Sequence, residues 1–181
     1  MNDLQPKPKL ATVWLDGCSG CHMSFLDMDE QLIDLAMRAD LVYSPLVDNK
    51  IFPEHVDITL VEGAVSSAED LEKIQHIRAH TKYLVSFGDC AVTGNIPALR
   101  NLFGTPAILQ RAYIENVTLY PQVPKRVVPP LLERVLPVHQ VVKVDVFVPG
   151  CPPSAETIFY VVSELLHGRM PDLTGRTRFG K

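Results

Sequence analysis

The sequence lacks an excess of charge of one sign and lacks long apolar runs. Its 181 residues include 17 Lys and Arg against 21 Asp and Glu, which gives a formal net charge of −4. No cluster of basic residues stands out, and a nucleic-acid partner is not expected because such a protein needs a basic face. No apolar run reaches the roughly 18 residues that a membrane span requires. The N-terminus shows neither an apolar signal nor twin arginines, so a cytoplasmic protein is expected.

Nucleotide-binding motifs are also missing. Neither Gly-x-Gly-x-x-Gly nor a Walker loop occurs, so direct nucleotide binding is not indicated.

Cysteine is scarce, with four residues in the whole chain. In a reducing compartment, so few cysteines are interpreted as metal ligands or redox groups before disulfides.

Short apolar runs alternate with segments whose apolar residues recur every three to four positions. This alternation predicts an α/β protein with a parallel sheet covered on both faces, in a flavodoxin-like, doubly wound arrangement. The chain, 1–181, is expected to form a single domain, with its core at 10–168 and a tail at 169–181. Trp14 is assigned to the core of the first strand. The expected strands are 10–15, 41–43, 57–62, 83–87 and 144–148, and the expected helices are 24–39, 68–80 (capped by Ser67) and 154–167.

Proline is abundant, with 15 residues, and much of it falls within 104–137. This span is expected to be an irregular excursion with one or two short helices. Long loops in compact domains are usually functional. We interpret the span as a candidate docking surface, with a surface loop of no function as the alternative.

The four cysteines follow the ends of predicted strands. Cys18 and Cys21 follow the first strand, Cys90 follows the strand at 83–87, and Cys151 follows the last strand. Because loops after parallel strands meet at one edge of the sheet, the four thiols are expected to form one site.

Several sites could use these thiols. The Cys18-x-x-Cys21 pair alone is typical of a zinc knuckle, of a thioredoxin-type redox pair, or of two buried thiols. A thioredoxin pair leaves Cys90 and Cys151 without a role, and structural zinc sites usually combine two knuckles. A ligand Cys followed by Pro, as in Cys151-Pro-Pro, recurs in cluster proteins. The pattern therefore favours a [4Fe–4S] cluster over zinc, since each iron takes one thiolate.

Four glycines flank the cysteines: Gly17, Gly20, Gly88 and Gly150. Glycine lets backbone amides approach the sulfides of a cluster and donate hydrogen bonds to them. Tight turns after strands explain the same glycines, and both interpretations can hold together.

Charged residues at the same sheet edge have two interpretations each. Glu62 ends the strand at 57–62 and could relay protons or lower the cluster potential, or it could only cap a helix or turn. His22 could donate to a sulfur, or it could pack on the surface or at an interface. Asp16 and Asp89 are expected to cap or orient their loops.

Together these motifs resemble the small subunit of [NiFe] hydrogenases and, more distantly, the 20-kDa cluster subunit of respiratory complex I. The resemblance covers about 10–168. It implies that the four cysteines hold the cluster proximal to the nickel–iron site of a partner large subunit. The motifs that carry it are Asp16-Gly-Cys-Ser-Gly-Cys21, Val61-Glu-Gly-Ala64, Gly88-Asp-Cys90 and Val148-Pro-Gly-Cys-Pro-Pro153.

Two departures narrow the resemblance. The complex I subunit has adjacent cysteines in its first motif, whereas Cys18 and Cys21 are spaced as in hydrogenases. Longer hydrogenase small subunits add Cys and His ligands for two further clusters, which this sequence lacks. It is therefore similar to the small subunit of the cytoplasmic NAD-reducing enzyme. That resemblance implies a nickel–iron large subunit and diaphorase-side subunits as partners, which carry the NiFe centre, FMN, NAD and further Fe–S clusters.

No cysteine remains for nickel once the cluster is ligated, so hydrogen chemistry is expected on another chain. The expected role is the electron-transfer subunit of a hydrogen:NAD+ oxidoreductase, which relays electrons one at a time. Three alternatives stay open: a subunit of a coenzyme F420- or NADP-linked hydrogenase, a subunit of a complex I-like assembly, and a zinc-stabilised, non-redox assembly module.

Overall fold

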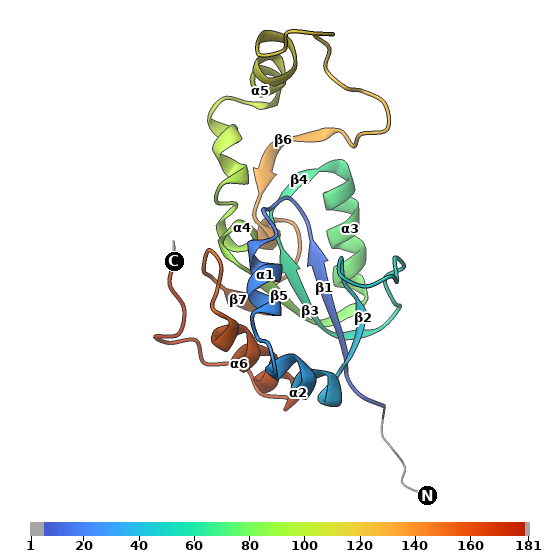
Figure 1. Ribbon diagram of the computed structural model, residues 1–181, viewed down its shortest axis with the longest axis vertical. Coiled ribbons are helices and arrows are strands. Elements are labelled where there is room, and N and C mark those ends of the chain that lie inside the picture. The colour runs from blue at the N-terminus through green and yellow to red at the C-terminus, as the bar shows by residue number, and fades with distance from the viewer. Residues whose placement is uncertain (1–5, 180–181) are drawn as a thin grey trace, which may run out of the picture.

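A computed structural model describes residues 6–179 (Figure 1). Within them, five parallel strands form one sheet in the order β2-β1-β3-β5-β7. This is the flavodoxin order, 2-1-3-4-5, and it confirms the predicted doubly wound α/β fold. The strands are β1 (Lys9–Trp14), β2 (Asp40–Tyr43), β3 (Val56–Glu62), β5 (Thr81–Phe87) and β7 (Val146–Val148).

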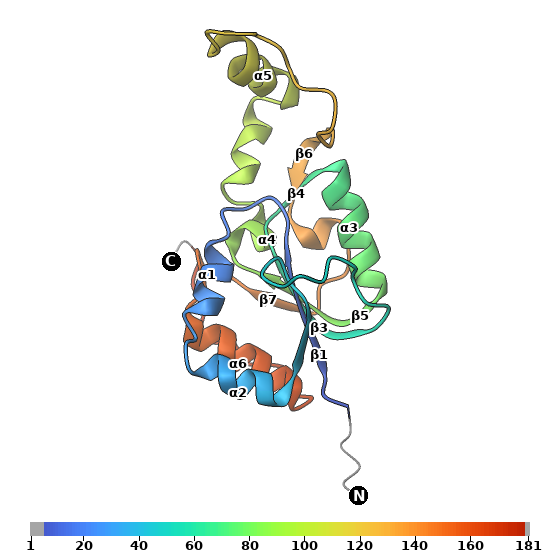
Figure 2. The ribbon, with the colours of Figure 1, turned by 45° about the vertical axis from the view of Figure 1, so that its right-hand side comes forward.

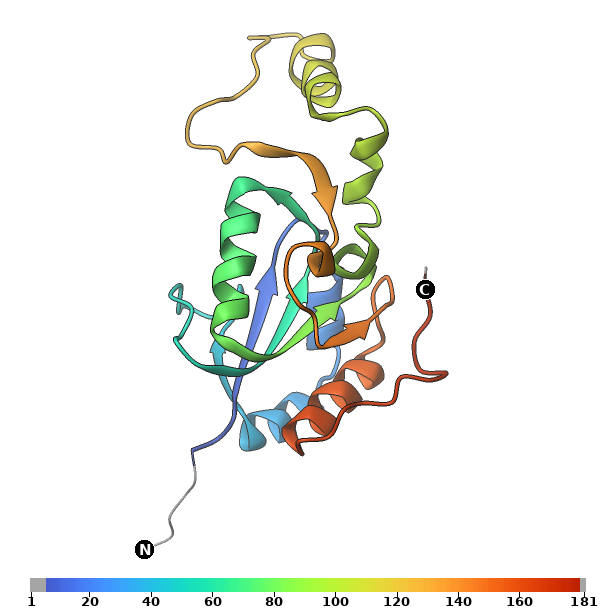
Figure 3. The same ribbon diagram turned by 180° about the vertical axis from the view of Figure 1, so that it is seen from behind.

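Helices cover both faces of the sheet (Figures 2 and 3). One face carries α1 (Gly20–Leu26), α2 (Gln31–Arg38) and α6 (Ala155–Leu166), and the other carries α3 (Ala68–Ala79). Side chains alternate between the two cores along each strand, as strand geometry requires. In β3, Leu60 packs toward α6 whereas its neighbour Val61 packs toward α3. None of the helices within 6–179 has both the length and the apolar character needed to cross a membrane.

Helix α3 starts at the residue that the sequence predicts. The Ser67 hydroxyl accepts from the Asp70 amide at 3.1 Å, and the Asp70 carboxylate accepts from the Ser67 amide at 2.9 Å. This reciprocal capping box satisfies two amides that a helix N-terminus otherwise leaves without partners.

Two local predictions were wrong. The single helix expected at 24–39 is two helices, α1 and α2, separated by a turn in which Asp29 has φ 48°. Phe25 and Leu35 still reach the same core, which explains why their spacing imitates one continuous helix. Trp14 is 44% exposed rather than buried, because β1 ends there and the indole lies over the next loop, donating to the Gly17 carbonyl at 3.1 Å.

A second, two-stranded sheet was missed. Strand β4 (Val65–Ser67) pairs antiparallel with β6 (Leu131–Leu136). We call the five-stranded sheet with its covering helices the body. Between the short helix α4 (Asp89–Thr93) and β6 the chain leaves the body and returns, and we call residues 97–136 the arm. The arm projects beyond the sheet in all three ribbon views (Figures 1–3). The remaining helices are α4 (Asp89–Thr93), η1 (Pro97–Leu102), α5 (Thr105–Gln110), η2 (Arg111–Glu115) and η3 (Val138–Gln140).

Two side chains of η1 fasten the arm to the small sheet. The Arg100 guanidinium donates to the carbonyls of Leu132 and Ser66, both at 3.0 Å. The Asn101 side chain donates to the Val135 carbonyl at 2.9 Å and accepts from the Val135 amide at 2.8 Å. The side-chain amide of Asn101 therefore bonds both backbone groups of Val135, as a residue of a neighbouring strand would. These bonds hold the base of the arm, although no side chain of η1, α5 or η2 is buried.

Candidate metal centre

The four cysteines line one small cavity of about 50 Å³ at the carboxyl ends of the parallel strands. Cys18 lies in the loop after β1 and Cys21 lies in the first turn of α1. Cys90 belongs to α4, which follows β5, and Cys151 lies in the loop after β7. The sheet topology thus brings together thiols that are up to 133 residues apart in the sequence.

The cavity is buried on one side and open on the other. Cys21 is 8% exposed and Cys90 is half-buried, whereas Cys18 and Cys151 are exposed. Burial, followed by the neighbouring Cys151 and Cys18 thiols, raises the pKa of Cys90 to about 11. Burial and the adjacent Glu62 raise the pKa of Cys21 further still. The raised pKa values favour the protonated thiols, so a metal that binds Cys21 and Cys90 must displace their protons.

Gly88 makes room for the Cys21 sulfur. A β-carbon at Gly88 would lie 2.2 Å from Cys21 Sγ, and the glycine has φ 84°. Both facts require glycine, since other residues rarely adopt this φ and any side chain would collide with the sulfur. Gly20 lies against Cys18 Sγ, with its hypothetical β-carbon at 3.2 Å.

Direct hydrogen bonds join the Cys90 and Cys151 loops. The Asp89 side-chain Oδ1 accepts from the Gly150 amide at 2.7 Å, and the Asp89 amide donates to the Gly150 carbonyl at 2.8 Å. A third bond reaches the same loop, because Ser24 of α1 donates to the Pro153 carbonyl at 2.6 Å. Asp89 thus orients the loops, as expected.

Asp16 and Gly17 lie on the other side, where the first cysteine loop meets the end of β3. Asp16 and Ala64 form an isolated antiparallel bridge, with N–O distances of 3.1 and 2.7 Å. A β-carbon at Gly17 would lie 3.2 Å from Gly63 Cα, so Gly17 serves close backbone approach. Backbone bonds rather than the Asp16 carboxylate therefore anchor this loop.

Glu62 is 1% exposed and accepts hydrogen bonds from the start of α1. It receives the amides of Cys21 at 3.4 Å and of His22 at 3.0 Å, and it also bonds His22 Nδ1. The first amides of a helix lack partners within the helix, and a carboxylate is favoured beside them. The capping interpretation of Glu62 thus has direct geometric support, and the carboxylate holds α1 against the end of β3.

His22 is buried, so the expectation that it packs on the surface or at an interface was wrong. The residue is 1% exposed, with Nδ1 bonded to Glu62 and Nε2 at 3.0 Å from the Thr12 hydroxyl. Thr12 in turn donates to the Ser44 hydroxyl at 2.8 Å. Both ring nitrogens therefore have oxygen partners. The reason is that the first turn of α1 directs this side chain inward, between the sheet and the helix.

Asn95 is a neighbour of the thiols that the sequence analysis missed. Its side-chain Nδ2 donates to Cys151 Sγ at 3.7 Å. The Gly94-Asn95 dipeptide signals a turn after the Cys90 segment, but nothing in the sequence connects it with residue 151.

The sequence allows two kinds of metal group at the four thiols, a single zinc ion and an iron–sulfur cluster. Within residues 6–179, no three or more His, Cys, Asp or Glu side chains are spaced as ligands of a single ion. Four cysteine thiols that line one cavity supply, once deprotonated, the donor set of a [4Fe–4S] cluster. The residues present fit that group.

Known proteins match nearly the whole chain. The delta subunit of the NAD-reducing hydrogenase HoxS from Cupriavidus necator is 44% identical over 172 residues, which cover 92% of this chain and 82% of the relative. One subunit of the F420-non-reducing hydrogenase from Methanothermobacter marburgensis is 40% identical over 173 residues. The match covers 92% of this chain and 56% of that relative, so the chain spans little more than half of the relative's length.

Solved structures agree with the sequence matches. A chain of an NAD+-reducing [NiFe]-hydrogenase in the H2-reduced state superposes with a TM-score of 0.91 at 40% identity, over 96% of this chain and 99% of that chain. A [NiFeSe]-hydrogenase chain from Dm. baculatum has a TM-score of 0.59 at 18% identity, over 97% and 70% of the two chains, and shows the fold alone. The predicted resemblance is confirmed. Residues 18–165 match the family described as NADH ubiquinone oxidoreductase, 20 Kd subunit, and the chain belongs to that family.

Proposed function

We propose that this chain is the electron-transfer small subunit of a soluble NAD-reducing [NiFe] hydrogenase. The observation that carries the proposal is the convergence of four thiols from separate loops on one cavity. The similarity to the HoxS delta subunit and to a chain of an NAD+-reducing [NiFe]-hydrogenase supports it. Cys18, Cys21, Cys90 and Cys151 would hold the [4Fe–4S] cluster, which supplies one-electron uptake and release when bound.

The chain's own contribution is to hold the four sulfurs in place before anything binds. Glu62 fixes the turn that carries Cys21, and Asp89 joins the Cys90 loop to the Cys151 loop. Preorganised loops lower the entropic cost of ligation, since their backbones are already ordered. The buried side of the cavity excludes water from Cys21, while the open side leaves a short path to a partner.

The proposed partners follow from the ligand count. All four cysteines of the chain are assigned to the cluster, so the nickel–iron centre belongs to a large subunit. Flavin and NAD belong to diaphorase-side subunits, and the assembly works in the cytoplasm. The arm, which contains nearly all of the Pro-rich span 104–137, is the candidate docking surface for one of these partners. The similarity to a chain of an F420-non-reducing hydrogenase favours, as a second candidate, a cytoplasmic hydrogenase with a different electron acceptor.

The variant Cys90→Ser tests the proposal in the purified complex. It should lose most of its iron and sulfide and its hydrogen-dependent NAD reduction. Diaphorase activity with artificial acceptors should survive, because that reaction bypasses this chain. Iron, sulfide and zinc analysis of the wild type separates the remaining possibilities. About four irons per chain support the cluster, one zinc without iron supports the assembly module, and normal hydrogen-dependent turnover without a cluster refutes the relay.

Glu62 supplies a finer test of the same site. We propose that its carboxylate, beside the Cys21 thiol and the start of α1, lowers the reduction potential of the bound group. Glu62→Gln keeps the shape of the side chain and one acceptor oxygen but removes the charge. The midpoint potential should rise in a redox titration at full iron content. An unchanged potential and an unchanged turnover rate would leave Glu62 with only its capping role.

A further inference from the structure

Asn95 lies where α4 ends and the arm begins, and its side chain reaches a cysteine of a different loop. We propose that Asn95 sets the reduction potential of the group that the cysteines hold, by donating a hydrogen bond to the Cys151 sulfur. The inference rests on the proposed function and adds a positioning residue to that site. Asn95 is uncharged and lies outside the cysteine motifs, so the motifs alone do not indicate this role.

The backbone holds Asn95 in place from both sides. Its amide donates to the Thr93 hydroxyl at 3.3 Å, and that hydroxyl donates to the Asp89 carbonyl at 2.8 Å. Its carbonyl accepts from the Ala98 amide at 3.1 Å, in the first turn of η1. Asn95 itself has φ 31°, and asparagine adopts positive φ at lower cost than most residues. The side-chain amide is therefore presented to the sulfur by an ordered turn rather than by a free loop.

The hydrogen bond connects two of the ligand segments. Asn95 follows the helix that carries Cys90, and its acceptor is the Cys151 sulfur, 56 residues further along the chain. Cys151 is exposed, so water would otherwise be its main hydrogen-bond donor. A partner subunit that excludes water from this side would remove those donors but leave the Asn95 amide. The contact therefore provides a donor whose geometry the protein controls.

The direction of the effect follows from charge. Reduction adds an electron to the group bound by the thiolates, and an N–H dipole pointing at a ligand sulfur stabilises the more negative state. Asn95 should therefore raise the reduction potential. Because an amide does not titrate, its contribution should be the same at every pH at which the site stays loaded.

Two substitutions separate this role from a structural one. Asn95→Gly removes the donor and tolerates the positive φ without strain, so the turn keeps its conformation. Asn95→Asp keeps the shape of the side chain but replaces the donor with a negatively charged acceptor. The matched control is Asn49→Gly in the β2–β3 connection, where the side chain bonds the Val42 carbonyl away from the cysteines.

The experiment is a redox titration of the purified complex, followed by the electron paramagnetic resonance of the reduced cluster, with iron and sulfide measured on the same samples. The equilibrium constant for one-electron reduction should fall about tenfold in Asn95→Gly, which is about 59 mV. It should fall further in Asn95→Asp and stay at the wild-type value in Asn49→Gly.

Other results overturn the inference. Equal potentials in the wild type and Asn95→Gly, with iron content retained in both, exclude a tuning role. Loss of iron in Asn95→Gly with an unchanged potential in the loaded fraction shows a purely structural residue. The absence of iron from the wild-type complex would be a different result, because it would refute the proposed function as well as the role of Asn95.

Discussion

Two glycines show how differently the sheet body and the arm are built. Gly88 in the body and Gly104 in the arm have nearly the same backbone conformation, with φ 84° and 78°. A β-carbon at Gly88 would collide with Cys21 Sγ at 2.2 Å, whereas at Gly104 the nearest atom is 4.0 Å away. The two glycines thus share a backbone conformation, but Gly88 is surrounded by sulfur and backbone atoms whereas Gly104 faces open space. The body determines where the cysteines lie, and the arm presents surface.

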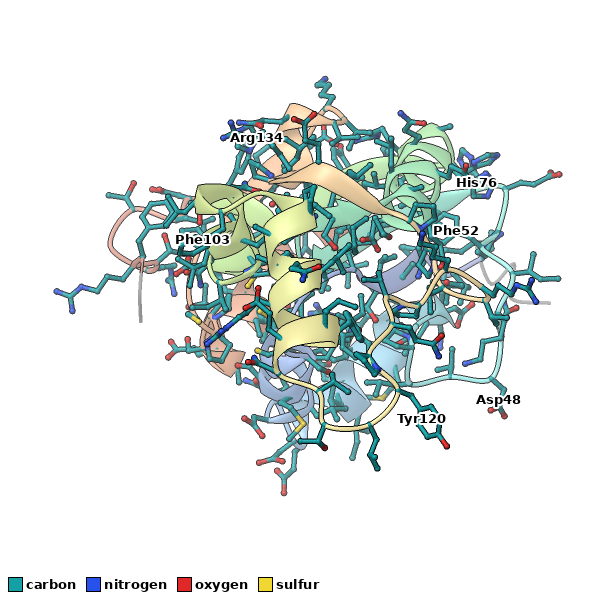
Figure 4. All side chains as sticks on the ribbon, turned by 90° about the horizontal axis from the view of Figure 1, so that it is seen from above. Asp48, Phe52, His76, Phe103, Tyr120 and Arg134 are labelled. Carbon is teal, nitrogen blue, oxygen red and sulfur yellow. The ribbon has the colours of Figure 1, made fainter. Side chains whose placement is uncertain are left out.

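The side chains repeat this contrast. Apolar residues of the central strands are almost completely buried, as Leu60 and Val61 are at 1% and 0% exposure. In the arm, Leu102, Phe103 and Tyr120 are 79%, 71% and 86% exposed. Figure 4 looks along the arm, with Tyr120 extending outward from it. Exposed apolar residues that gather in one segment are typical of an interaction surface. Substitutions in matched pairs can test whether the two regions are as different as they look.

The largest difference should come from the glycines themselves. Gly88→Ala should abolish iron binding and destabilise the body, because either the Cys21 sulfur or the strand end must move. Gly104→Ala should cost only the backbone strain of a conformation that is almost confined to glycine, with φ 78° and ψ 152°, about 1–3 kcal/mol. Urea unfolding and iron content measure both effects. Similar losses in the two variants would show that backbone conformation matters rather than the space around Cys21.

A second effect concerns the attachment of the arm. Arg100→Ala should remove the donor to the Ser66 carbonyl, at a cost of about 2 kcal/mol, whereas the Leu132 carbonyl keeps the Thr105 hydroxyl as a donor at 2.8 Å. Amide hydrogen exchange should accelerate in β4 and β6 and stay slow in β3. The control is Arg134→Ala, which removes an exposed arginine from β6 itself. If exchange rose equally in both variants, the base of the arm would not depend on Arg100.

A third and smaller effect compares two ion pairs. In the body, Asp145 accepts from Arg78 at 2.6 Å and from the Leu84 amide at 2.9 Å. Partial burial opposes ionisation, but these bonds outweigh it and lower the pKa of Asp145. The stabilisation is therefore full above about pH 4 and is lost as the pH falls through the lowered pKa.

Asp145→Asn should thus lower the stability by about 1–2 kcal/mol at neutral pH, with the difference from the wild type vanishing in acid. Glu115→Gln in the arm removes the exposed partner of Arg111, and exposed pairs of this kind contribute little. Urea unfolding at several pH values measures both. A difference for Asp145→Asn that stayed constant from neutral pH into acid would contradict the assignment.

The smallest effect on folding should come from Phe103→Ser. Its ring is exposed, so the stability of the isolated chain should not change measurably. Co-purification of a partner subunit should weaken if the arm is the docking surface. The control is Ile33→Ser, which changes an apolar residue of α2 with a similar exposure of 65%. Unchanged partner recovery in Phe103→Ser would remove the arm from the proposed interface.

Prediction from the sequence succeeded where one dominant pattern decided the outcome. Runs such as residues 57–62 and the Ser67 cap predicted their elements because burial and capping act locally. The strand-end positions of the cysteines predicted their convergence, since parallel topology alone brings such loops together. The assignment of each cysteine as a ligand remains a prediction.

The misses share a different cause. β4 and β6 are short and partly polar, and they pair only because the arm returns, which no local pattern encodes. His22 looked like a surface residue because its partners Thr12 and Glu62 come from two other strands. Asn95 was overlooked for the same reason, because its contact is to a sulfur 56 residues away. Side chains that act across the sheet edge are visible only once the topology is known.

The open side of the cysteine cavity has a consequence for the order of assembly. If the cysteines hold the proposed cluster, iron and sulfide can be delivered after the chain has folded, because Cys18 and Cys151 are exposed while Cys21 forms the floor of the cavity. A subunit that came to rest over the exposed pair would close this entrance. Delivery must then precede docking, and a cell that reversed the two steps would accumulate complete but empty complexes.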